Sequence, residues 1–401
     1  MAGGGMLWSG RVAVAARRGV AAMAALALAA PAVVAGAQEE RPAEEQPGEE
    51  RPFDLRFLGP FRTRDLTPTS LLRLDLPPAH GVRGPAGAWA VEVGYSHANT
   101  FVMSDTVRQY LTQRDRRAPL DEADVEALFA RDGDVFYFDA EVGWIALTAH
   151  YGLTERWQLY ATLPVQYYRG GLFDNAVEGF HEMFGFSTAS RDLVSRHDVQ
   201  VVQRVGEDRF VLLAPPEQLG IGDPVLGGRF HLLDRGRWHV VGEAALKVPL
   251  GEVDDYFSSG HADVGVQLSV QRELERNALY LSTSWIHVGG SDFFPHLDPG
   301  GIPTVSFAWE HLLSPRTSTV VQLTGSGSSF PATEVSELAE NKYLVSVGFR
   351  RRNGHRVWSV ALTENVANFN NSPDIGLHVG YALVMEGPRP RLFLGERPGP
   401  G

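Results

Sequence analysis

Apolar and polar residues alternate with a period of two through most of this chain. In residues 262–270 every second side chain is apolar, and the residues between them are Asp263, Gly265, Gln267 and Ser269. Successive side chains of a β-strand point to opposite faces, so the pattern predicts strands with one apolar and one polar face. It recurs about twelve times over stretches of roughly 9–11 residues, the length that a tilted strand needs to cross a bilayer. The stretches begin near residues 89, 136, 157, 226, 238, 262, 279, 305, 319, 343, 358 and 375.

Short and long connections alternate between these stretches along the second half of the chain. The short ones read as hairpin turns and lie at 234–237, 314–316 and 352–355. The long ones lie at 101–134, 168–222, 250–260, 289–302, 326–341 and 365–374. Short periplasmic turns and long outer loops are typical of outer-membrane barrels. We therefore predict an all-β fold, a closed antiparallel transmembrane β-barrel of about 12 strands with short helices in long outer loops.

Tryptophans lie near the ends of several predicted strands, where they are expected to form girdles at the membrane interfaces. They are Trp89, Trp157, Trp238, Trp285, Trp309 and Trp358. A large exported β-sandwich also has alternating strands, so alternation alone leaves this second architecture open. The two differ in whether the apolar faces contact lipid or meet in a dry interior between two sheets.

The N-terminus predicts export. Residues 1–37 contain Arg11, Arg17 and Arg18, then an apolar stretch, and they end in a small-x-small site before Gln38, as a cleaved signal peptide does. Residues 38–52 are rich in Glu and Pro and are expected to be a disordered acidic linker. The barrel is expected over 53–386, with 53–80 as a plug or a periplasmic segment, and 387–401 as a disordered Pro/Gly-rich tail.

Composition excludes several classes of protein. The chain has no cysteine, which removes disulfides, cysteine metal sites and a cysteine nucleophile. The net charge is −12, and −11 of it falls after residue 51, whereas nucleic-acid binding calls for a basic face. After the leader no apolar run reaches the roughly 18–20 residues of a transmembrane helix. The expected partners are outer-membrane lipid and a small-molecule solute, without nucleic acid.

Motifs for catalysis are weak. None of the thirteen histidines is followed two residues later by serine, the simplest lipase-like arrangement on a strand, although a distant Ser–His pair stays open. His181-Glu182 begins like the HExxH zinc motif, but Gly185 stands where the second histidine belongs. We therefore expect no catalytic residue and no cofactor.

Acidic loops offer the remaining metal chemistry. Asp254-Asp255, and Asp292 with His296 and Asp298, could hold a divalent cation through carboxylate oxygens. Solvated acidic loops are the favoured interpretation, and no metal site is predicted.

Charged residues on the polar faces are the main functional candidates. They are expected to project into the barrel lumen, where they either fill it with ion pairs or line a selective permeation path. These candidate lumen-lining residues are Glu92, Asp139, Glu141, Arg229, Glu243, Lys247, Asp263 and Arg350.

Two segments have helical patterns instead. Residues 121–130 begin with acidic residues and favour a helix, and 176–186 place Val177, Phe180, Met183 and Phe184 on one helical face. The favoured interpretation is a short helix packed over a loop, and the alternative is a lid or plug.

Several motifs resemble those of known bacterial families. Residues 151–157 (YGLTERW), followed by Leu163-Pro164-Val165, resemble a strand–turn–strand signature of outer-membrane barrels associated with aromatic-degradation meta pathways. Residues 59–68 (GPFRTRDLTP) and 180–185 (FHEMFG) resemble an uncharacterised domain-of-unknown-function family of exported bacterial proteins. That family usually has Arg-Asn where this chain has Arg64-Asp65. The resemblance runs from about 57 to 386 and implies an envelope location and a barrel fold, but it transfers no catalytic residue.

Three functions follow as hypotheses. The first is a non-enzymatic outer-membrane barrel that passes or binds a small solute, hydrophobic solutes included, with 53–78 or 176–186 occluding it. The second is a structural or adhesive envelope protein with a filled lumen and interacting outer loops. The third is an outer-membrane hydrolase, which needs a cluster of serine, histidine and acid.

Overall fold

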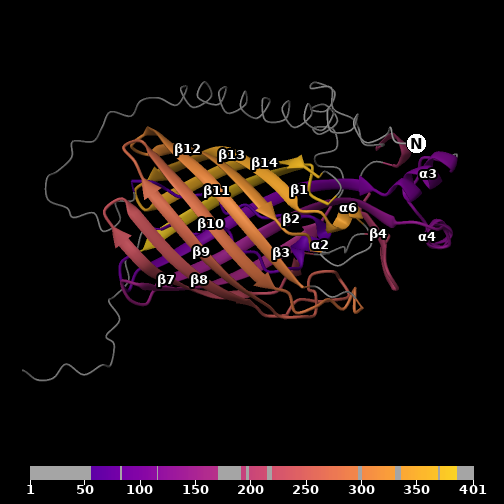
Figure 1. Cartoon of the computed structure of the whole chain (residues 1–401), viewed down its shortest axis with the longest axis horizontal. Coiled ribbons are helices and arrows are strands. Elements are labelled where there is room, and N and C mark those ends of the chain that lie inside the picture. Colours follow the sequence, from indigo (N-terminus) through magenta and orange to yellow (C-terminus); the bar gives the residue numbers. More distant parts are fainter. Residues whose placement is uncertain are drawn as a thin grey trace, which may run out of the picture.

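The protein forms a closed β-barrel in its computed structural model (Figure 1). The structure describes residues 56–81, 84–114, 116–169, 191–195, 198–214, 219–296, 300–329, 336–368 and 371–385. The predicted signal peptide, linker and C-terminal tail, and the helix expected at 176–186, lie outside the described residues.

Twelve strands make the barrel, each paired antiparallel with its neighbours in the chain. The ring closes where β1 pairs with β15, from Trp89 opposite Met385 to Asn99 opposite Ile375. Closure leaves no barrel strand with a free edge, which is what a sheet in hydrocarbon requires. The strands are β1 (Trp89–Met103), β2 (Val135–Gly152), β3 (Trp157–Tyr168), β7 (Val225–Arg235), β8 (Trp238–Lys247), β9 (Asp263–Glu273), β10 (Asn277–His287), β11 (Gly301–Ser314), β12 (Thr317–Ser326), β13 (Lys342–Asn353), β14 (Arg356–Ala367) and β15 (Ile375–Met385).

The fold predicted from alternation is therefore confirmed, down to the short turns. Gly236 and Gly354 adopt φ of 60° and 58° in two of these turns, a conformation that glycine takes without steric cost. The short turns share one end of the barrel, which we call the short-turn end. The long connections share the other, the long-loop end.

The two faces of the barrel strands have the polarity of a membrane barrel. In β9, Asp263 and Gln267 are buried, whereas Val264, Val266 and Leu268 are 50%, 54% and 42% exposed. All twelve barrel strands carry at least one large apolar side chain that is exposed in this way. A soluble sandwich would bury these side chains between its sheets, so the alternative architecture is excluded.

Aromatic side chains gather at the short-turn end. Pairs of rings pack across neighbouring strands there, with centroids 4.6 Å apart for Trp89–Tyr151 and 4.5 Å for Trp358–Tyr381. Of the six tryptophans predicted at strand ends, Trp285 lies at the long-loop end of β10, and the other five lie at the short-turn end.

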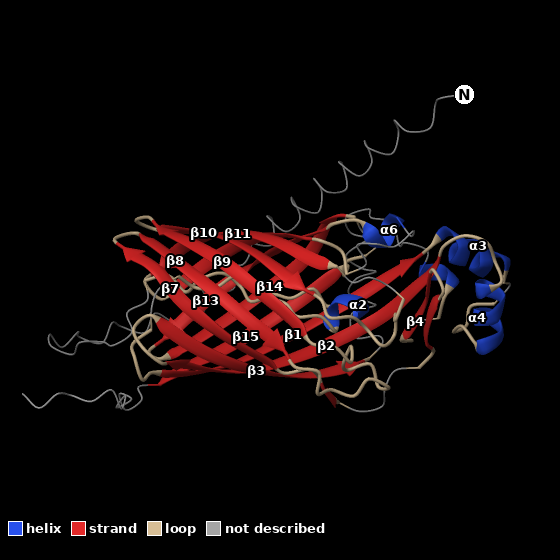
Figure 2. Ribbon diagram, turned by 60° about the horizontal axis from the view of Figure 1, so that its bottom comes forward, coloured by secondary structure: helices blue, strands red, loops and turns tan. Residues whose placement is uncertain are grey.

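A small unit projects beyond the long-loop end (Figures 1 and 2). The first residues of β2 extend past the barrel and pair with β4 (Gln200–Val205), which pairs with β5 (Asp208–Leu212). Helices α3 (Asp105–Gln113) and α4 (Glu122–Phe129) pack with this sheet around a separate apolar core. Asp121 begins α4 with a capping box, as its acidic start suggests.

The remaining described elements are short. They are α2 (Pro68–Leu71), the 3₁₀ helix η1 (Arg191–Leu193), β6 (Gly220–Ile221) and α6 (Ser336–Ala339). β6 adds two residues to the edge of β3 near the long-loop end.

Residues 56–81 and 84–88 lie inside the barrel, and we call them the inner segment. Its first arm starts at the short-turn end, where Arg56 donates to the Glu275 carbonyl in the turn between β9 and β10. The segment turns at α2 near the long-loop end, and Ser70 there hydrogen-bonds Ser329 at 2.8 Å. Its second arm returns to the short-turn end, where Gly87 donates to the Gly152 carbonyl just before β1 begins.

Candidate functional site

The first arm of the inner segment is anchored by a buried carboxylate. Glu310 on β11 is 0% exposed and accepts hydrogen bonds from the backbone N–H groups of Leu58 and Gly59, both at 2.9 Å. Tyr280 also donates to it at 2.7 Å. A buried carboxylate needs hydrogen-bond donors in place of water, and here the inner segment and β10 supply them.

The tip of the inner segment is held by a buried amine. Lys342 at the start of β13 lies 2.7 Å from an Asp65 carboxylate oxygen. The same ammonium donates to Thr67 Oγ1 at 3.2 Å and to Ser70 Oγ at 2.5 Å. Asp65 therefore supplies the negative charge that pairs with this buried lysine.

The second arm is held by a charged cluster on β8 and β9. Lys247 Nζ donates to the Leu72 carbonyl at 2.7 Å, and Asp263 accepts from the Leu74 N–H at 2.8 Å. Lys247 also lies 3.0 Å from Asp223 and 3.4 Å from Asp263. The cluster pairs its own charges and still binds the backbone of the inner segment.

Neutral side chains continue this attachment toward the short-turn end. Gln267 Nε2 donates to the Pro77 carbonyl at 3.1 Å, and the Gly81 N–H donates to Gln271 Oε1 at 2.8 Å. The inner segment is therefore fixed along the half of the barrel formed by β8 to β13.

Sequence reasoning did not single out Glu310 or Lys342. Both belong to the inward-facing polar set of their strands, next to apolar residues that point outward. The alternation that identified Asp263 as a lumen candidate could therefore have identified them as well. Only the contacts with the inner segment distinguish them from other lumen residues.

Three cavities remain in the lumen. The turn-end and middle cavities lie mainly beside β1, β2, β3, β14 and β15, and the loop-end cavity lies between β2, β3 and Lys247 of β8. The turn-end cavity has a volume of about 190 Å³, the middle cavity about 90 Å³ and the loop-end cavity about 10 Å³. Arg62 and Glu92 line both of the first two, and Arg64 and Trp144 line both of the last two. The three cavities therefore adjoin one another along the length of the lumen.

Arg62 bridges the gap between the inner segment and β1. Its Nη1 lies 2.8 Å from Glu92 Oε2 and 3.3 Å from His150 Nε2 on β2. His150 in turn lies 3.6 Å from the same Glu92 oxygen. This ion pair stands where the turn-end cavity meets the middle cavity.

Arg229 and Glu243 form a second buried pair in the lumen. Arg229 Nε donates to Glu243 at 2.8 Å, and Tyr160 on β3 donates to the same carboxylate at 2.6 Å. The Arg229 guanidinium also lies 4.8 Å from the centre of the Tyr160 ring. These contacts link β3, β7 and β8 within the wall, so neither charge holds the inner segment.

Arg350 faces the lumen from β13 near the short-turn end. Its Nη1 donates to the Leu58 carbonyl, and its guanidinium lies 5.6 Å from the centre of the Phe61 ring. The residue therefore contacts the first arm and also lines the turn-end cavity.

Asp139 and Glu141 do not line the lumen, contrary to the prediction for them. Trp144, which contacts Arg64 of the inner segment, shows that even-numbered residues of β2 face inward. The two acids belong to the opposite face, where Glu141 accepts from Asn99 at 3.3 Å and lies 3.3 Å from His97 Nε2. The sequence assignment reversed the faces of β2 because its long-loop half is buried on both sides.

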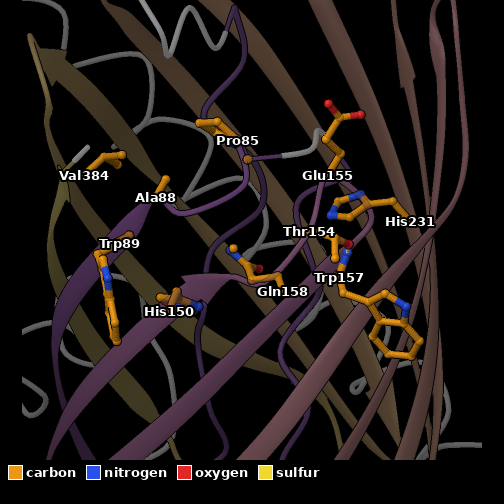
Figure 3. A pocket seen from close by; sticks show the side chains of 13 residues that line it. Pro85, Ala88, Trp89, His150, Thr154, Glu155, Trp157, Gln158, His231 and Val384 are labelled. Atoms are coloured by element: carbon orange, nitrogen blue, oxygen red, sulfur yellow. Dashed lines mark hydrogen bonds between the residues drawn. The ribbon is translucent and has the colours of Figure 1, made fainter. Parts of the chain in front are cut away.

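The mouth of the lumen at the short-turn end is a small pocket of about 20 Å³. Figure 3 shows Pro85 and Ala88 of the inner segment near its upper part, with Gln158 and His150 below them. Glu155 in the β2–β3 turn also lines it. The mouth shares Gly84, Ala90, His150, Gln158 and Val384 with the turn-end cavity.

An apolar cap covers the long-loop end of the cavities. Leu71 and Leu72 at the tip pack in one buried cluster with loop residues Tyr256 and Phe257 and with Tyr168 of β3. Phe257 lines the loop-end cavity itself. A solute that travels the full length of the lumen must displace part of this cap.

One serine–histidine pair does lie in the lumen. Ser96 Oγ on β1 is 2.7 Å from His378 Nδ1 on the neighbouring strand β15. Within the described residues no carboxylate completes it into a triad. The constellation that the hydrolase hypothesis needs is therefore incomplete.

Two of the loop residues considered as metal candidates have other partners. Asp292 lies 3.0 Å from His261, and His296 lies 2.5 Å from Asp208. Asp298 lies outside the described residues. Across the described ranges no group of three or more His, Asp or Glu side chains is placed to hold a metal ion.

No helix in the described part of the chain is long and apolar enough to cross a membrane.

Comparison with known families finds one match. The family model described as "Protein of unknown function (DUF3187)" matches residues 120–384. The predicted resemblance to an uncharacterised family is confirmed, although the matched region starts after the 59–68 motif. No curated protein matches the chain.

Solved structures with similar folds are barrels. The COG4313 outer membrane channel from Pseudomonas putida F1 has a TM-score of 0.48 and 16% identity, covering 78% of this chain and 100% of that one. The KdgM porin has a TM-score of 0.35 and 5% identity, covering 73% and 98%. The P. putida toluene transporter TodX has a TM-score of 0.33 and 9% identity, covering 74% and 88%. Similarity at this level does not identify a solute.

Proposed function

The chain belongs to the DUF3187 family, whose function is unknown, and we propose that it is a non-enzymatic outer-membrane channel that passes a small solute beside its inner segment. The observation that carries the proposal is the asymmetry of the lumen. Hydrogen bonds fix the inner segment to β8 through β13, while adjoining cavities follow the opposite wall.

The membrane location rests on the outer surface of the barrel. Exposed apolar side chains surround all twelve strands, and aromatic pairs ring the short-turn end. In water this ring of exposed apolar side chains would promote aggregation, whereas in a bilayer the side chains contact lipid hydrocarbon without a desolvation penalty. The predicted signal peptide agrees with export to that membrane, with the short-turn end in the periplasm.

Two contacts control the path in this proposal. The Arg62–Glu92 pair separates the turn-end and middle cavities, and the apolar cap covers the long-loop end. For a solute to pass, the ion pair must break and the cap must move aside, while the anchors at Glu310, Lys342 and Lys247 stay in place.

A disulfide that locks the inner segment tests this mechanism. A Cβ built on Gly81 lies 2.9 Å from Gln271 Cβ and 2.8 Å from His239 Cβ, so the chain at Gly81 must move back by about 1 Å to reach the usual disulfide Cβ spacing of about 3.8 Å. The chain has no native cysteine, so the Gly81→Cys/Gln271→Cys variant adds a single possible disulfide. The full chain is reconstituted into liposomes, and uptake of small neutral and charged solutes is measured with the disulfide oxidised and then reduced.

We expect equal uptake in both states, because the locked side is not the path. Uptake only after reduction would show that the segment must leave the lumen. Absence of uptake of every solute in both states, and in the unmodified protein, would contradict the channel function itself. Each single cysteine variant serves as the matched control.

The projecting unit favours a second candidate, adhesion through the outer loops. β2 extends past the barrel to carry a β-hairpin and two helices on a separate core, more structure than a barrel needs for closure. Replacing residues 104–134 with a short Gly/Ser loop distinguishes the two functions. Loss of surface binding with unchanged uptake supports adhesion, and unchanged surface binding contradicts it.

A further inference from the structure

The short-turn end of the barrel is rich in exposed arginines. At least one lies in or beside each of the five short turns, at the end of the barrel opposite α3 and α4 (Figure 2). In chain order, one from each turn, these are Arg156, Arg237, Arg276, Arg316 and Arg356. We propose that arginines at this end, with the tryptophans beside them, bind the phosphate groups of anionic phospholipids in the periplasmic leaflet of the membrane. The inference rests on the proposed function, which places this end of the barrel in the periplasm.

The long-loop end has the opposite charge. Its last four connections contain acidic residues such as Asp254 and Asp255 but no lysine or arginine, and they span 248–262, 288–300, 327–341 and 368–374. The chain as a whole has a net charge of −12. The excess of arginine at the short-turn end is therefore local, and a membrane surface of negative potential attracts that end of the barrel.

The positive charge at the short-turn end is not neutralised within the protein. No described carboxylate lies within 4 Å of the turn arginines, and Arg276 donates to a neutral acceptor, the Leu312 carbonyl, at 2.9 Å. Two acids near these turns, Asp234 and Glu273, instead lie 2.8 Å and 3.6 Å from the buried His239. The arginines can therefore bind an anion outside the protein.

The first lipid site is a row of three side chains across β7, β8 and β9. Arg235 lies directly opposite Trp238 in the strand register, and Trp238 lies directly opposite Arg272. Residues directly opposite one another in antiparallel strands share a face, and Trp238 is 45% exposed on the outer surface. The Arg272 guanidinium lies 5.0 Å from the centre of the Trp238 ring. An outward-facing indole is thus flanked by two cations at the level where aromatic girdles meet lipid headgroups.

The second lipid site lies on β13 and β14. Arg351 is directly opposite Trp358, which is 51% exposed and packs on Tyr381 of β15. Arg356 comes two residues before Trp358 on β14, so both side chains lie on the same face of the strand. The second site therefore repeats the first, with two arginines beside one outward-facing tryptophan.

The chemistry of these side chains fits a phosphate. The planar guanidinium presents a fork of N–H donors that can bind two phosphate oxygens at once, and it stays charged at physiological pH. The contact between Arg272 and Trp238 restricts the arginine before a ligand arrives. Binding then costs less side-chain conformational entropy.

The neighbouring outward residues favour a lipid over a soluble polyanion. On β9 the side chains that share the face of Arg272 are Val270, Leu268 and Val266, and the last two are 42% and 54% exposed. A phospholipid can place its phosphate on the guanidinium and its acyl chains along these residues. A soluble polyanion would use the arginines alone.

The test counts the lipids that the protein retains. The purified full chain in detergent is mixed with equal amounts of phosphatidylglycerol and phosphatidylcholine, and bound lipids are identified by native mass spectrometry. We expect two phosphatidylglycerol molecules, one for each site, and a preference over phosphatidylcholine of about fivefold. Equal retention of the two lipids would overturn the proposal. Retention of neither would also overturn it and would favour a soluble polyanion as the partner.

Double variants separate the two sites. Arg235→Gln/Arg272→Gln should retain one phosphatidylglycerol molecule fewer than the unmodified protein, because the first site loses both of its cations. Arg351→Gln/Arg356→Gln should lose the molecule at the second site. Each count is made on protein that shows heat-modifiable migration, so a variant that fails to fold is not mistaken for one that fails to bind.

Two exposed arginines at the other end of the molecule give the matched control. Arg108 on α3 and Arg209 on β5 belong to the projecting unit. Arg108→Gln/Arg209→Gln removes the same number of charges and should retain both phosphatidylglycerol molecules. Equal counts in this control and in the two site variants would contradict the inference.

Solute uptake into liposomes separates this inference from the channel function. Uptake by a protein that shows no preference for phosphatidylglycerol leaves the channel intact and refutes the lipid sites. Retention of phosphatidylglycerol that the site variants lose, without uptake of any solute, refutes the channel and leaves the lipid sites.

Discussion

Arg62 of the inner segment lies 2.8 Å from Glu92 of β1, and this ion pair crosses the gap that the lumen cavities leave open. Both side chains are about one-quarter exposed, at 24% and 22%. The pair therefore joins the inner segment to the barrel wall between the turn-end and middle cavities, so it is the contact at which the proposed channel would control solute passage.

Breaking this pair should increase passage. A partly exposed ion pair contributes about 1 kcal/mol, which corresponds to roughly a fivefold change in an equilibrium between closed and open states. Arg62→Gln and Glu92→Gln should each raise the rate of solute uptake into liposomes by up to about fivefold. The exposed pair Arg108–Asp105 on α3 is the control, and its neutralisation should leave uptake unchanged. Slower uptake in both lumen variants would contradict a gating role.

The carboxylate of Glu310 should fix the first arm of the inner segment. Glu310→Ala leaves two backbone N–H groups and the Tyr280 hydroxyl without their acceptor, and each buried unsatisfied donor costs about 1–3 kcal/mol. We expect trypsin to cleave after Arg56 or Arg62 in this variant much faster than in the unmodified protein, as followed by mass spectrometry. Glu126→Ala on the exposed face of α4 is the control. Unchanged cleavage would show that other contacts suffice to hold the arm.

The exposed apolar belt should require lipid. Val266 on β9 is 54% exposed on the outer surface of the barrel. A lysine in its place puts a charge in hydrocarbon, which costs about 2–4 kcal/mol near the middle of a membrane. Val266→Lys should lower the free energy of unfolding from lipid vesicles by that amount, measured by urea titration. Val211→Lys on β5, beyond the barrel, should have almost no effect, and an equal loss in both variants would argue against the membrane assignment.

The projecting unit should lose stability in acid. Burial opposes ionisation of Asp124 on α4, but hydrogen bonds from Tyr110, the Asp121 backbone and Arg114 outweigh it and lower the pKa of this carboxyl to about 2. A carboxyl whose pKa is lower in the folded state stabilises that state above its unfolded pKa, and the contribution is lost as the pH falls through the folded value.

Protease resistance of α3 and α4 should therefore decline between about pH 4 and about pH 2. Pepsin, which is active in this range, provides the measurement. Asp124→Asn should remove this pH dependence and make the unit less resistant at pH 4. An unchanged pH profile in the variant would assign the acid sensitivity to another group.

Alternation by itself determined the strands, their number and the positions of the short turns. This holds because a strand between lipid and a polar lumen must change polarity at every residue, as the stretch from Asp263 to Gln271 does. The rule fails where its physical cause is absent. In the long-loop half of β2 both faces are buried by protein. The polarity of a side chain there does not show whether it points into or out of the barrel, and Glu141 was therefore assigned to the wrong side.

Only the tertiary structure decided what the lumen contains. The inner segment is held by single side chains, such as Glu310, Asp263 and Lys342, that lie between 189 and 275 residues away in the sequence. Such contacts leave no periodic pattern in the segment itself. Sequence could place Lys247 and Arg350 in the lumen but could not tell an anchor from a ligand-binding group. That distinction depends on which charges have partners within a few ångströms, and this is set by the packing of distant segments inside the closed barrel.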